Sequence, residues 1–281
     1  MTSSNNDYYD WQHGYWADHA VEWEKWAEIV APQAEGFNRP LIDAAGIGTG
    51  GRVLDLACGA GEPSLTAAET VGAEGHVTAS DYSPEMLAVA ERRAKAKGFG
   101  NMSFRQADMR ALPFEDGSFD HVISRFGYMY TEEPATTAAE ILRVLRPGGR
   151  VALMVWGPME NNTVLSVALN AANQELNVLD EEAADHPAAF AEAGSLSSVF
   201  DAAGFLEAAE QDMNFEPSIP VGLPFWQPIV GMNLGAAMRD LDKAALQALD
   251  AKVAEAYAPY IKDGKYRLAA HIRVLSARKA D

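Results

Sequence analysis

The stretch VLDLACGAG, residues 53–61, decides the fold. It opens with a short apolar run that holds one acidic residue, Asp55, and it ends in a turn with two glycines, Gly59 and Gly61. Residues 63–71 follow with helical composition and begin with proline, whose missing N–H is not needed in a first turn. A strand, a glycine turn and a helix in this order predict the first unit of a parallel α/β sheet.

The same alternation continues along the chain and sets the fold class. Strands are expected at residues 76–80, 102–107, 119–124 and 151–156, and helices at residues 84–97 and 134–145. Strands separated by helices indicate an α/β fold with helices on both faces of a parallel sheet. Beyond these, the patterns predict helices at residues 162–176, 195–203, 225–238 and 242–256, and strands at residues 206–216 and 266–277.

The amino-acid composition argues against several kinds of partner, including nucleic acids, membranes and metals. The 281 residues carry 22 Lys and Arg against 40 Asp and Glu, a net charge of −18, so the chain lacks the basic surface that nucleic acids and anionic membranes require. A single cysteine, Cys58, excludes internal disulfides and indicates either a reducing compartment or a protein that is indifferent to redox conditions. The histidines show no paired spacing, and no apolar run approaches the length of about 18 residues that a membrane span needs. We therefore expect no metal, no membrane insertion and a soluble, cytoplasmic protein.

Two glycine clusters compete as ligand-binding turns. Residues 46–51 contain the spacing G-x-G-x-x-G, but they precede the first expected strand, so we interpret them as a loop that leads into it. The turn at Gly59 and Gly61 lies at the carboxyl end of that strand, where open parallel sheets bind ligands. Ser64 stands where a dinucleotide site would have its third glycine, which argues against a nicotinamide cofactor.

Acidic residues follow three successive strand ends. Asp55 precedes the glycine turn, Asp81 ends the second expected strand and Asp108 follows the third. Asp81 can accept hydrogen bonds from both ribose hydroxyls of a nucleoside, and Asp108 can accept one from an adenine amino group. Three carboxylates at equivalent positions favour a cationic, phosphate-free adenosine ligand.

Together these motifs resemble those of class I S-adenosylmethionine-dependent methyltransferases, in the branch similar to the ubiquinone and menaquinone C-methyltransferases. The resemblance rests on residues 53–61, 79–81, 106–114 and 145–149. It implies a Rossmann-like, seven-stranded, mostly parallel sheet whose last strand, expected at residues 266–277, is antiparallel. At Ala57 the chain departs from the family motif, which has glycine there.

The resemblance also assigns residues to the cofactor S-adenosylmethionine. The ribose is expected at Asp81, and the sulfonium above Ser124. The adenine is expected at Asp108, flanked by Tyr82 and Met86. The full implied set is Asp55, Ala57, Gly59, Gly61, Asp81, Tyr82, Met86, Asp108, Met109 and Ser124.

Aromatic residues crowd the start of the chain, where their spacing predicts a helix that ends before Pro32. We expect an N-terminal aromatic helical cap at residues 1–40 and a methyltransferase domain at residues 41–281, with a substrate-covering helical insertion at about residues 217–260. These helices could instead bury one another or form the face of a homodimer. The substrate-lid candidates are Trp11, Trp16, Tyr128 and Trp226.

The predicted reaction is methyl transfer to oxygen or carbon of a small apolar or aromatic metabolite, because the expected walls of the site are apolar and aromatic. A base is needed only if the acceptor must lose a proton. His13 is the predicted catalytic base, and Tyr128, Tyr130 and His186 are the alternatives. N-methylation of a small amine stays open, because aromatic cages attract cations. A non-catalytic S-adenosylmethionine-binding protein also stays open.

Overall fold

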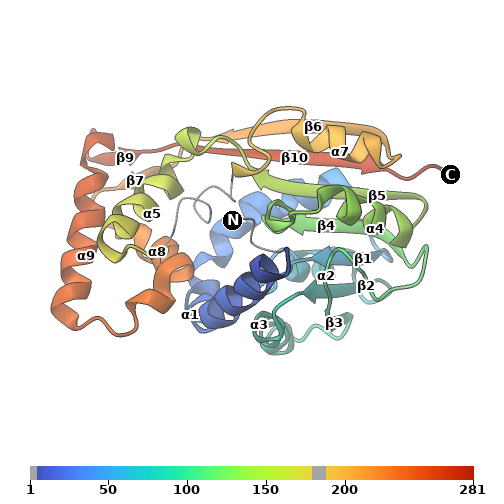
Figure 1. Cartoon of the computed structure of the whole chain (residues 1–281), viewed down its shortest axis with the longest axis horizontal. Coiled ribbons are helices and arrows are strands. Elements are labelled where there is room, and N and C mark those ends of the chain that lie inside the picture. Colours follow the sequence, from blue (N-terminus) through green and yellow to red (C-terminus); the bar gives the residue numbers. More distant parts are fainter. Residues whose placement is uncertain (1–4, 179–187) are drawn as a thin grey trace.

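The computed structural model describes residues 5–178 and 188–281 and builds them around a seven-stranded sheet (Figure 1). The strand order is β3-β2-β1-β4-β5-β10-β6. The predicted α/β fold with a mostly parallel sheet is therefore confirmed. The strands are β1 (Arg52–Leu56), β2 (His76–Asp81), β3 (Met102–Gln106), β4 (Phe119–Arg125), β5 (Leu145–Trp156), β6 (Leu206–Phe215) and β10 (Ala270–Arg278).

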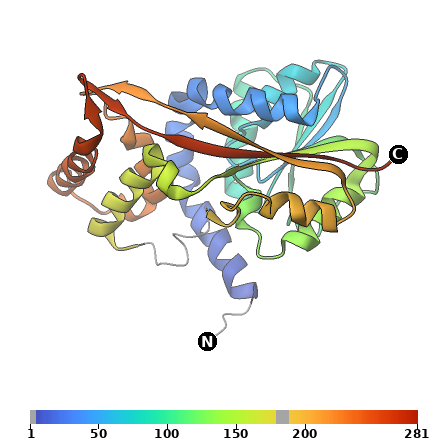
Figure 2. The same cartoon turned by 90° about the horizontal axis from the view of Figure 1, so that it is seen from above.

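The last strand, β10, runs antiparallel between β5 and β6, as predicted, and lies with β6 on the near side of the sheet in Figure 2. The expected strand at residues 266–277 is nevertheless two strands. Its first part, β9 (Lys265–Arg267), pairs with β7 (Ser218–Pro220) and β8 (Ile261–Lys262) in a separate three-stranded sheet. The chain leaves the ladder at Ala269, whose N–H donates to Thr163 Oγ1 at 2.8 Å.

Helices cover both faces of the large sheet. On one face, α2 (Ser64–Val71) and α3 (Pro84–Ala96) pack on β1 and β2. On the other, α4 (Pro134–Val144) and α7 (Ser195–Ala202) pack on β4 and β5. Because both faces are covered, successive residues of β1 from Val53 to Leu56 are all buried, including the acidic Asp55.

The first helix, α1 (Asn5–Ala45), corrects the prediction of a helix that ends before Pro32. It continues through Pro32 and Pro40, and its last turns bury Leu41, Ile42 and Ala45 against the sheet. Each internal proline costs a helix about 3 kcal/mol, but burial of each large apolar side chain contributes about 1.5–3 kcal/mol. The predicted division at residue 40 thus falls inside one helix, and the division itself stays a prediction.

A helical part stands beside the end of the sheet. Its longer helices, at the left of Figure 1, share an apolar core of their own that includes Trp226, Leu249 and Tyr257. The helix α8 packs directly on α1 at a glycine: a Cβ on Gly231 would lie 2.3 Å from Trp26 Nε1. The elements are α5 (Thr163–Leu176), α8 (Trp226–Leu234) and α9 (Lys243–Ala256), with the short 3-10 helices η1 (Tyr128–Tyr130), η2 (Met159–Asn161), η4 (Gly235–Met238) and η5 (Ala258–Tyr260) elsewhere in the chain.

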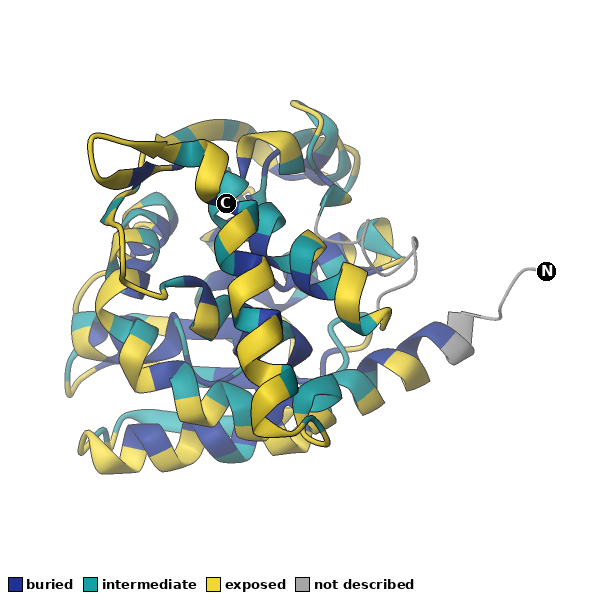
Figure 3. Ribbon diagram, turned by 90° about the vertical axis from the view of Figure 1, so that its left-hand side faces the viewer, coloured by how far each residue is buried: buried dark blue, intermediate teal, exposed yellow. Residues whose placement is uncertain are grey.

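The two parts of α1 have different surroundings. Its C-terminal end lies against the sheet core, whereas its N-terminal end projects past the sheet, with buried and exposed residues alternating along it (Figure 3). Gly235 lets η4 approach this helix as well, since a Cβ there would lie 2.5 Å from Glu22 Cγ. The N-terminal half of α1 and the helical part therefore together face the carboxyl edge of the sheet.

Candidate active site

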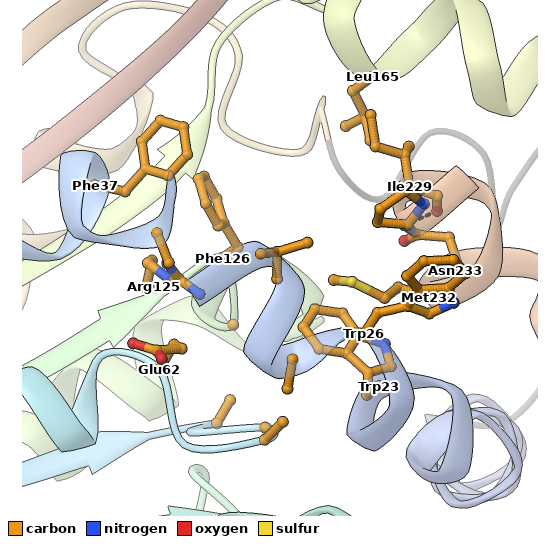
Figure 4. Close-up of a pocket in the computed structure, with 18 of the residues that line it drawn as sticks. Trp23, Trp26, Phe37, Glu62, Arg125, Phe126, Leu165, Ile229, Met232 and Asn233 are labelled. Atoms are coloured by element: carbon orange, nitrogen blue, oxygen red, sulfur yellow. Dashed lines mark hydrogen bonds between the residues drawn. The ribbon is translucent and has the colours of Figure 1, made fainter. Parts of the chain in front are cut away.

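A cavity of about 970 Å³ lies between the carboxyl ends of β1, β2 and β4 and the helices α1, α5 and α8 (Figure 4). Its charged lining residues come from the sheet side, its loops and α3, and the other lining residues are largely apolar or aromatic. The charged lining residues are Glu62, Asp81, Arg93, Asp108 and Arg125. The carboxyl edge of a parallel sheet is where the predicted cofactor residues were expected to meet.

Asp81 lies at the polar end of the cavity and is held by backbone donors. Its Oδ2 accepts from Gly59 N at 2.8 Å, and its Oδ1 accepts from Ser83 N at 2.9 Å. Burial raises the pKa of this carboxyl to about 6. Each oxygen keeps a second lone pair for a ligand hydroxyl, so the geometry suits a ribose.

The glycine turn has a backbone that favours glycine, yet Ala57 adopts it with φ 54°. The space for its methyl group comes from Gly127, where a Cβ would lie only 2.4 Å from Ala57 Cβ. Gly59, with φ 52°, leaves the turn open toward the cavity. The departure at Ala57 is therefore matched by a glycine at the end of β4.

Asp55, Gly61 and Ser124 do not line the cavity, and their roles at the methionine end and beneath the sulfonium stay predictions. Asp55 is fully buried beneath it, where one carboxylate oxygen accepts from the Ser64 hydroxyl and Oδ1 has no partner in the described structure. Burial raises the pKa of Asp55 to about 7. The Ser124 hydroxyl donates to the Leu56 carbonyl at 2.7 Å. These three residues support the turn from below.

Asp108 lines the cavity but already has a cationic partner. Its Oδ2 lies 2.6 Å from Arg110 Nη2, and the same guanidinium reaches Glu133 Oε1 at 2.9 Å. Arg110 also lies 3.4 Å from the centre of the Tyr9 ring on α1. The carboxylate expected at the adenine is thus tied to the N-terminal helix. The predicted cofactor residues that line the cavity are Ala57, Gly59, Asp81, Tyr82, Met86, Asp108 and Met109.

Of the four lid candidates, only Trp16 lines the cavity. Trp11 is 43% exposed. Tyr128 belongs to the core below the sheet edge, where its hydroxyl donates to the Pro134 carbonyl at 2.7 Å. Trp226 belongs to the helical core, and its indole N–H donates to Asp250 Oδ1 at 2.7 Å. The last two have partners that fix them away from the cavity.

His13, the predicted base, does not line the cavity. Its ring packs edge-on against Tyr82, with 5.5 Å between the ring centres. His186 lies outside the described residues, and Tyr128 is in the core. Tyr130 does line the cavity, and burial raises its pKa well above the ordinary range of tyrosine. No histidine is among the described lining residues.

The other end of the cavity is aromatic, and the sequence did not indicate most of it. Phe126, also with a left-handed backbone at φ 59°, stacks on Trp156 at 4.2 Å. Phe37 packs edge-on against Phe126, as the left of Figure 4 shows. Further aromatic lining residues are Tyr9, Trp23, Trp26, Phe215 and Phe225.

The fold and the site together define a class. A sheet with β10 inserted antiparallel, a glycine turn after β1 and a carboxylate at the end of β2 are the features of class I S-adenosylmethionine-dependent methyltransferases. Residues 53–149 match the family described as a methyltransferase domain, so the chain carries such a domain. Among residues 5–178 and 188–281, no helix combines the length and the hydropathy that a membrane span requires.

Relatives match the chain over its central part. A Lactococcus lactis demethylmenaquinone methyltransferase is 44% identical over 103 residues, 37% of this chain and 41% of the relative. An uncharacterized Mycobacterium tuberculosis protein is 44% identical over 131 residues, 47% of this chain and 45% of that protein. The chain thus matches somewhat under half the length of these curated relatives. A solved structure of Haemonchus contortus phosphoethanolamine N-methyltransferase 2 has the same fold, with a TM-score of 0.60, 19% identity and coverage of 100% of this chain and 61% of that chain.

Proposed function

We propose that the protein transfers the methyl group of S-adenosylmethionine to oxygen or carbon of a small apolar or aromatic metabolite. One observation carries the proposal: a continuous cavity joins the polar turn at Gly59 and Asp81 to the aromatic walls around Phe126 and Trp156. A donor bound at the turn would present its methyl group toward those walls. An acceptor stacked there could reach it in line.

The chemistry asks for alignment more than for acid or base groups. Displacement from a sulfonium destroys charge, so a site that excludes water and fixes nucleophile, methyl and sulfur in line supplies much of the rate. Apolar and aromatic side chains from α1, α5 and α8 would exclude water here. A proton released by a phenol or quinol would pass to solvent or to a carboxylate of the cavity, such as Glu62.

The curated relatives support an aromatic acceptor. The Lactococcus lactis relative is named for demethylmenaquinone, and an Idiomarina loihiensis relative, 37% identical over 119 residues, is a ubiquinone/menaquinone biosynthesis C-methyltransferase. A quinol ring is planar and apolar and would suit a wall formed by the stacked pair Phe126 and Trp156.

A second candidate is N-methylation of a small amine. Four further aromatic side chains line the cavity, namely Trp16, Trp23, Trp26 and Tyr130, and the Trp16 and Tyr130 rings meet edge-on at 5.4 Å. Aromatic faces attract ammonium groups by about 0.5–2 kcal/mol. Against it, Arg125 lies beside the aromatic wall without an ion pair to any described residue and would repel an ammonium group placed there.

The experiment is an assay of S-adenosylhomocysteine release across matched phenols, quinols and amines. Turnover of phenols or quinols would support the main proposal, and turnover of amines alone would replace it with the second candidate. Binding of S-adenosylmethionine with no turnover across the panel would favour a binding protein. Preparations of Asp81→Ala serve as the control for contaminating activity.

A further inference from the structure

Arg125, at the carboxyl end of β4, differs from the other arginines in its surroundings. It lines the cavity and is partly buried, yet no carboxylate of the described residues lies within ion-pair distance of its guanidinium. Its buried Nε has no hydrogen-bond partner there either. By contrast, Arg93 lies 2.8 Å from Glu28 Oε1 and 3.1 Å from Glu62 Oε1. A desolvated cation without a counter-ion is costly, so a bound anion would stabilise this arrangement.

Asn38 explains why Glu62 does not neutralise Arg125. This fully buried amide stands between the two, with its Oδ1 accepting from Arg125 Nη1 at 2.9 Å and its Nδ2 donating to Glu62 Oε2 at 2.6 Å. A second donation, to Thr66 Oγ1 at 2.9 Å, fixes the orientation of the amide. Arg93 occupies the other oxygen of Glu62. The network therefore holds Arg125 in place through a neutral group, while Glu62 and Asp55 act on its charge only from beyond ion-pair distance.

The guanidinium lies beside the aromatic wall of the site. Its centre is 5.9 Å from the Phe126 ring, and Figure 4 shows it between Phe126 and Glu62 at the wall of the cavity. A planar guanidinium binds a carboxylate through two parallel hydrogen bonds. A doubly charged phosphate fits less well, because Glu62, Asp81 and Asp108 line the same cavity and would repel it.

We propose that Arg125 is the carboxylate-binding residue of this cavity. The inference rests on the proposed function and deepens it by naming an acidic group on a ligand of that site. The carboxylate belongs either to the amino-acid end of the methyl donor or to the acceptor. These two sources have the same chemistry at Arg125 and are separated by experiment.

The test uses calorimetry with paired charged and neutral ligands. S-adenosylhomocysteine is compared with 5′-methylthioadenosine, which has the adenosine but no carboxylate. 4-Hydroxybenzoate is compared with its methyl ester, both titrated with and without S-adenosylhomocysteine. The variants are Arg125→Gln and Arg125→Lys, with Arg105→Gln as the control, because Arg105 is exposed on β3 and does not line the cavity.

Arg125→Gln should weaken one carboxylate ligand at least about tenfold and leave its neutral partner unchanged. Weakening of S-adenosylhomocysteine identifies the donor as the source, and weakening of 4-hydroxybenzoate identifies the acceptor. Arg125→Lys keeps the positive charge and is the second variant if Arg125→Gln does not fold. Its affinity for the carboxylate ligand should lie between the affinities of the unmodified protein and of Arg125→Gln.

The inference is overturned if Arg125→Gln changes the affinity for neither carboxylate ligand, or if it lowers the affinities for the charged and neutral ligands of a pair equally. If the unmodified protein binds neither S-adenosylhomocysteine nor 5′-methylthioadenosine, the proposed function fails. The 4-hydroxybenzoate pair still decides the role of Arg125 in that case.

Discussion

The two ends of the cavity are built in different ways. At the cofactor end, Asp81 and the glycine turn belong to consecutive β-α units, and backbone N–H groups hold the carboxylate within 3 Å. At the acceptor end, the lining comes from α1, the end of β4 and α8, which are far apart in the sequence. The first end is a local motif repeated by the fold, whereas the second exists only after the helices have packed. Substitutions should therefore separate cofactor affinity from acceptor recognition.

The largest effect is expected at the cofactor end. Asp81→Ala removes an acceptor of charged hydrogen bonds and should weaken S-adenosylhomocysteine binding about 100-fold, since each such bond contributes about 1.5–3 kcal/mol. Calorimetry measures it, with Asp81→Asn as the shape-preserving variant. The control is Asp116→Ala, because that side chain is 81% exposed. Unchanged affinity would contradict the placement of the ribose at Asp81.

Asp55, below the cofactor end, should make the stability of the folded protein depend on pH. Its pKa of about 7 in the folded protein lies above its unfolded value, so the folded state binds the extra proton and stability falls as pH rises through this range. Relative to Asp55→Asn, the protein should lose about 2 kcal/mol of unfolding free energy between pH 5 and pH 7.5. Urea unfolding of both proteins at the two pH values checks it. Buried Asp81, His19 and His121 are present in both proteins, so the stability changes that come from their own titration cancel in the difference. A constant difference would contradict the raised pKa.

The boundary between the two ends is the contact of Ala57 with Gly127. Gly127→Ala would bring two Cβ atoms to 2.4 Å, and overpacking of this kind costs about 1–3 kcal/mol. Adding Ala57→Gly should restore part of that loss in thermal or urea unfolding. The control is Gly100→Ala, because a Cβ at that position meets nothing within 4 Å. Additive losses in the double variant would show that the contact does not couple the two positions.

A smaller effect is expected at the acceptor end. Gly231→Ala pushes α8 away from Trp26, so the KM for an acceptor found in the panel should rise about threefold while S-adenosylhomocysteine affinity stays constant. Gly14→Ala, at a helical glycine with open space around it, is the matched control. A parallel change in cofactor affinity would mean that the two ends are not separable.

The smallest effect is expected for His13→Gln. The ring lies against Tyr82 and outside the cavity, so turnover should change by less than about twofold. Steady-state kinetics over pH 6 to 9 measure it. A tenfold loss with a shifted pH profile would restore His13 as the base.

The cofactor end was readable from sequence because its chemistry is local. The residues from Ala57 to Gly59 and the acid at position 81 follow strand ends directly, and a strand end fixes where the next side chains lie. Asp55 and Ser124 lie below the cavity, because alternation along a strand turns such residues into the sheet rather than over its edge. Arg125, the very next residue, reaches the cavity instead.

The acceptor end could not be read in this way. Aromatic residues in a helical pattern look alike whether they face a ligand or a core, and only long-range partners decide. Asp250 holds the indole of Trp226 from 24 positions away. The continuation of α1 past Pro32 likewise depends on a sheet that buries Leu41 and Ile42. Without those partners, the helix was expected to end too early, and Phe37 and Asn38 were missed.

One continuous α1 also limits how ligands enter. Its 41 residues would be roughly 60 Å long in a straight helix, but its N-terminal and C-terminal halves run in different directions in Figure 2. One end is anchored in the sheet core, while the other contacts Arg110 through Tyr9. Because the halves form one helix, the N-terminal half cannot move as a separate body unless the bend changes, and Pro32 and Pro40 each lack the N–H of a regular helical hydrogen bond. A change in the bend of this helix would therefore alter the apolar wall that it contributes to the cavity.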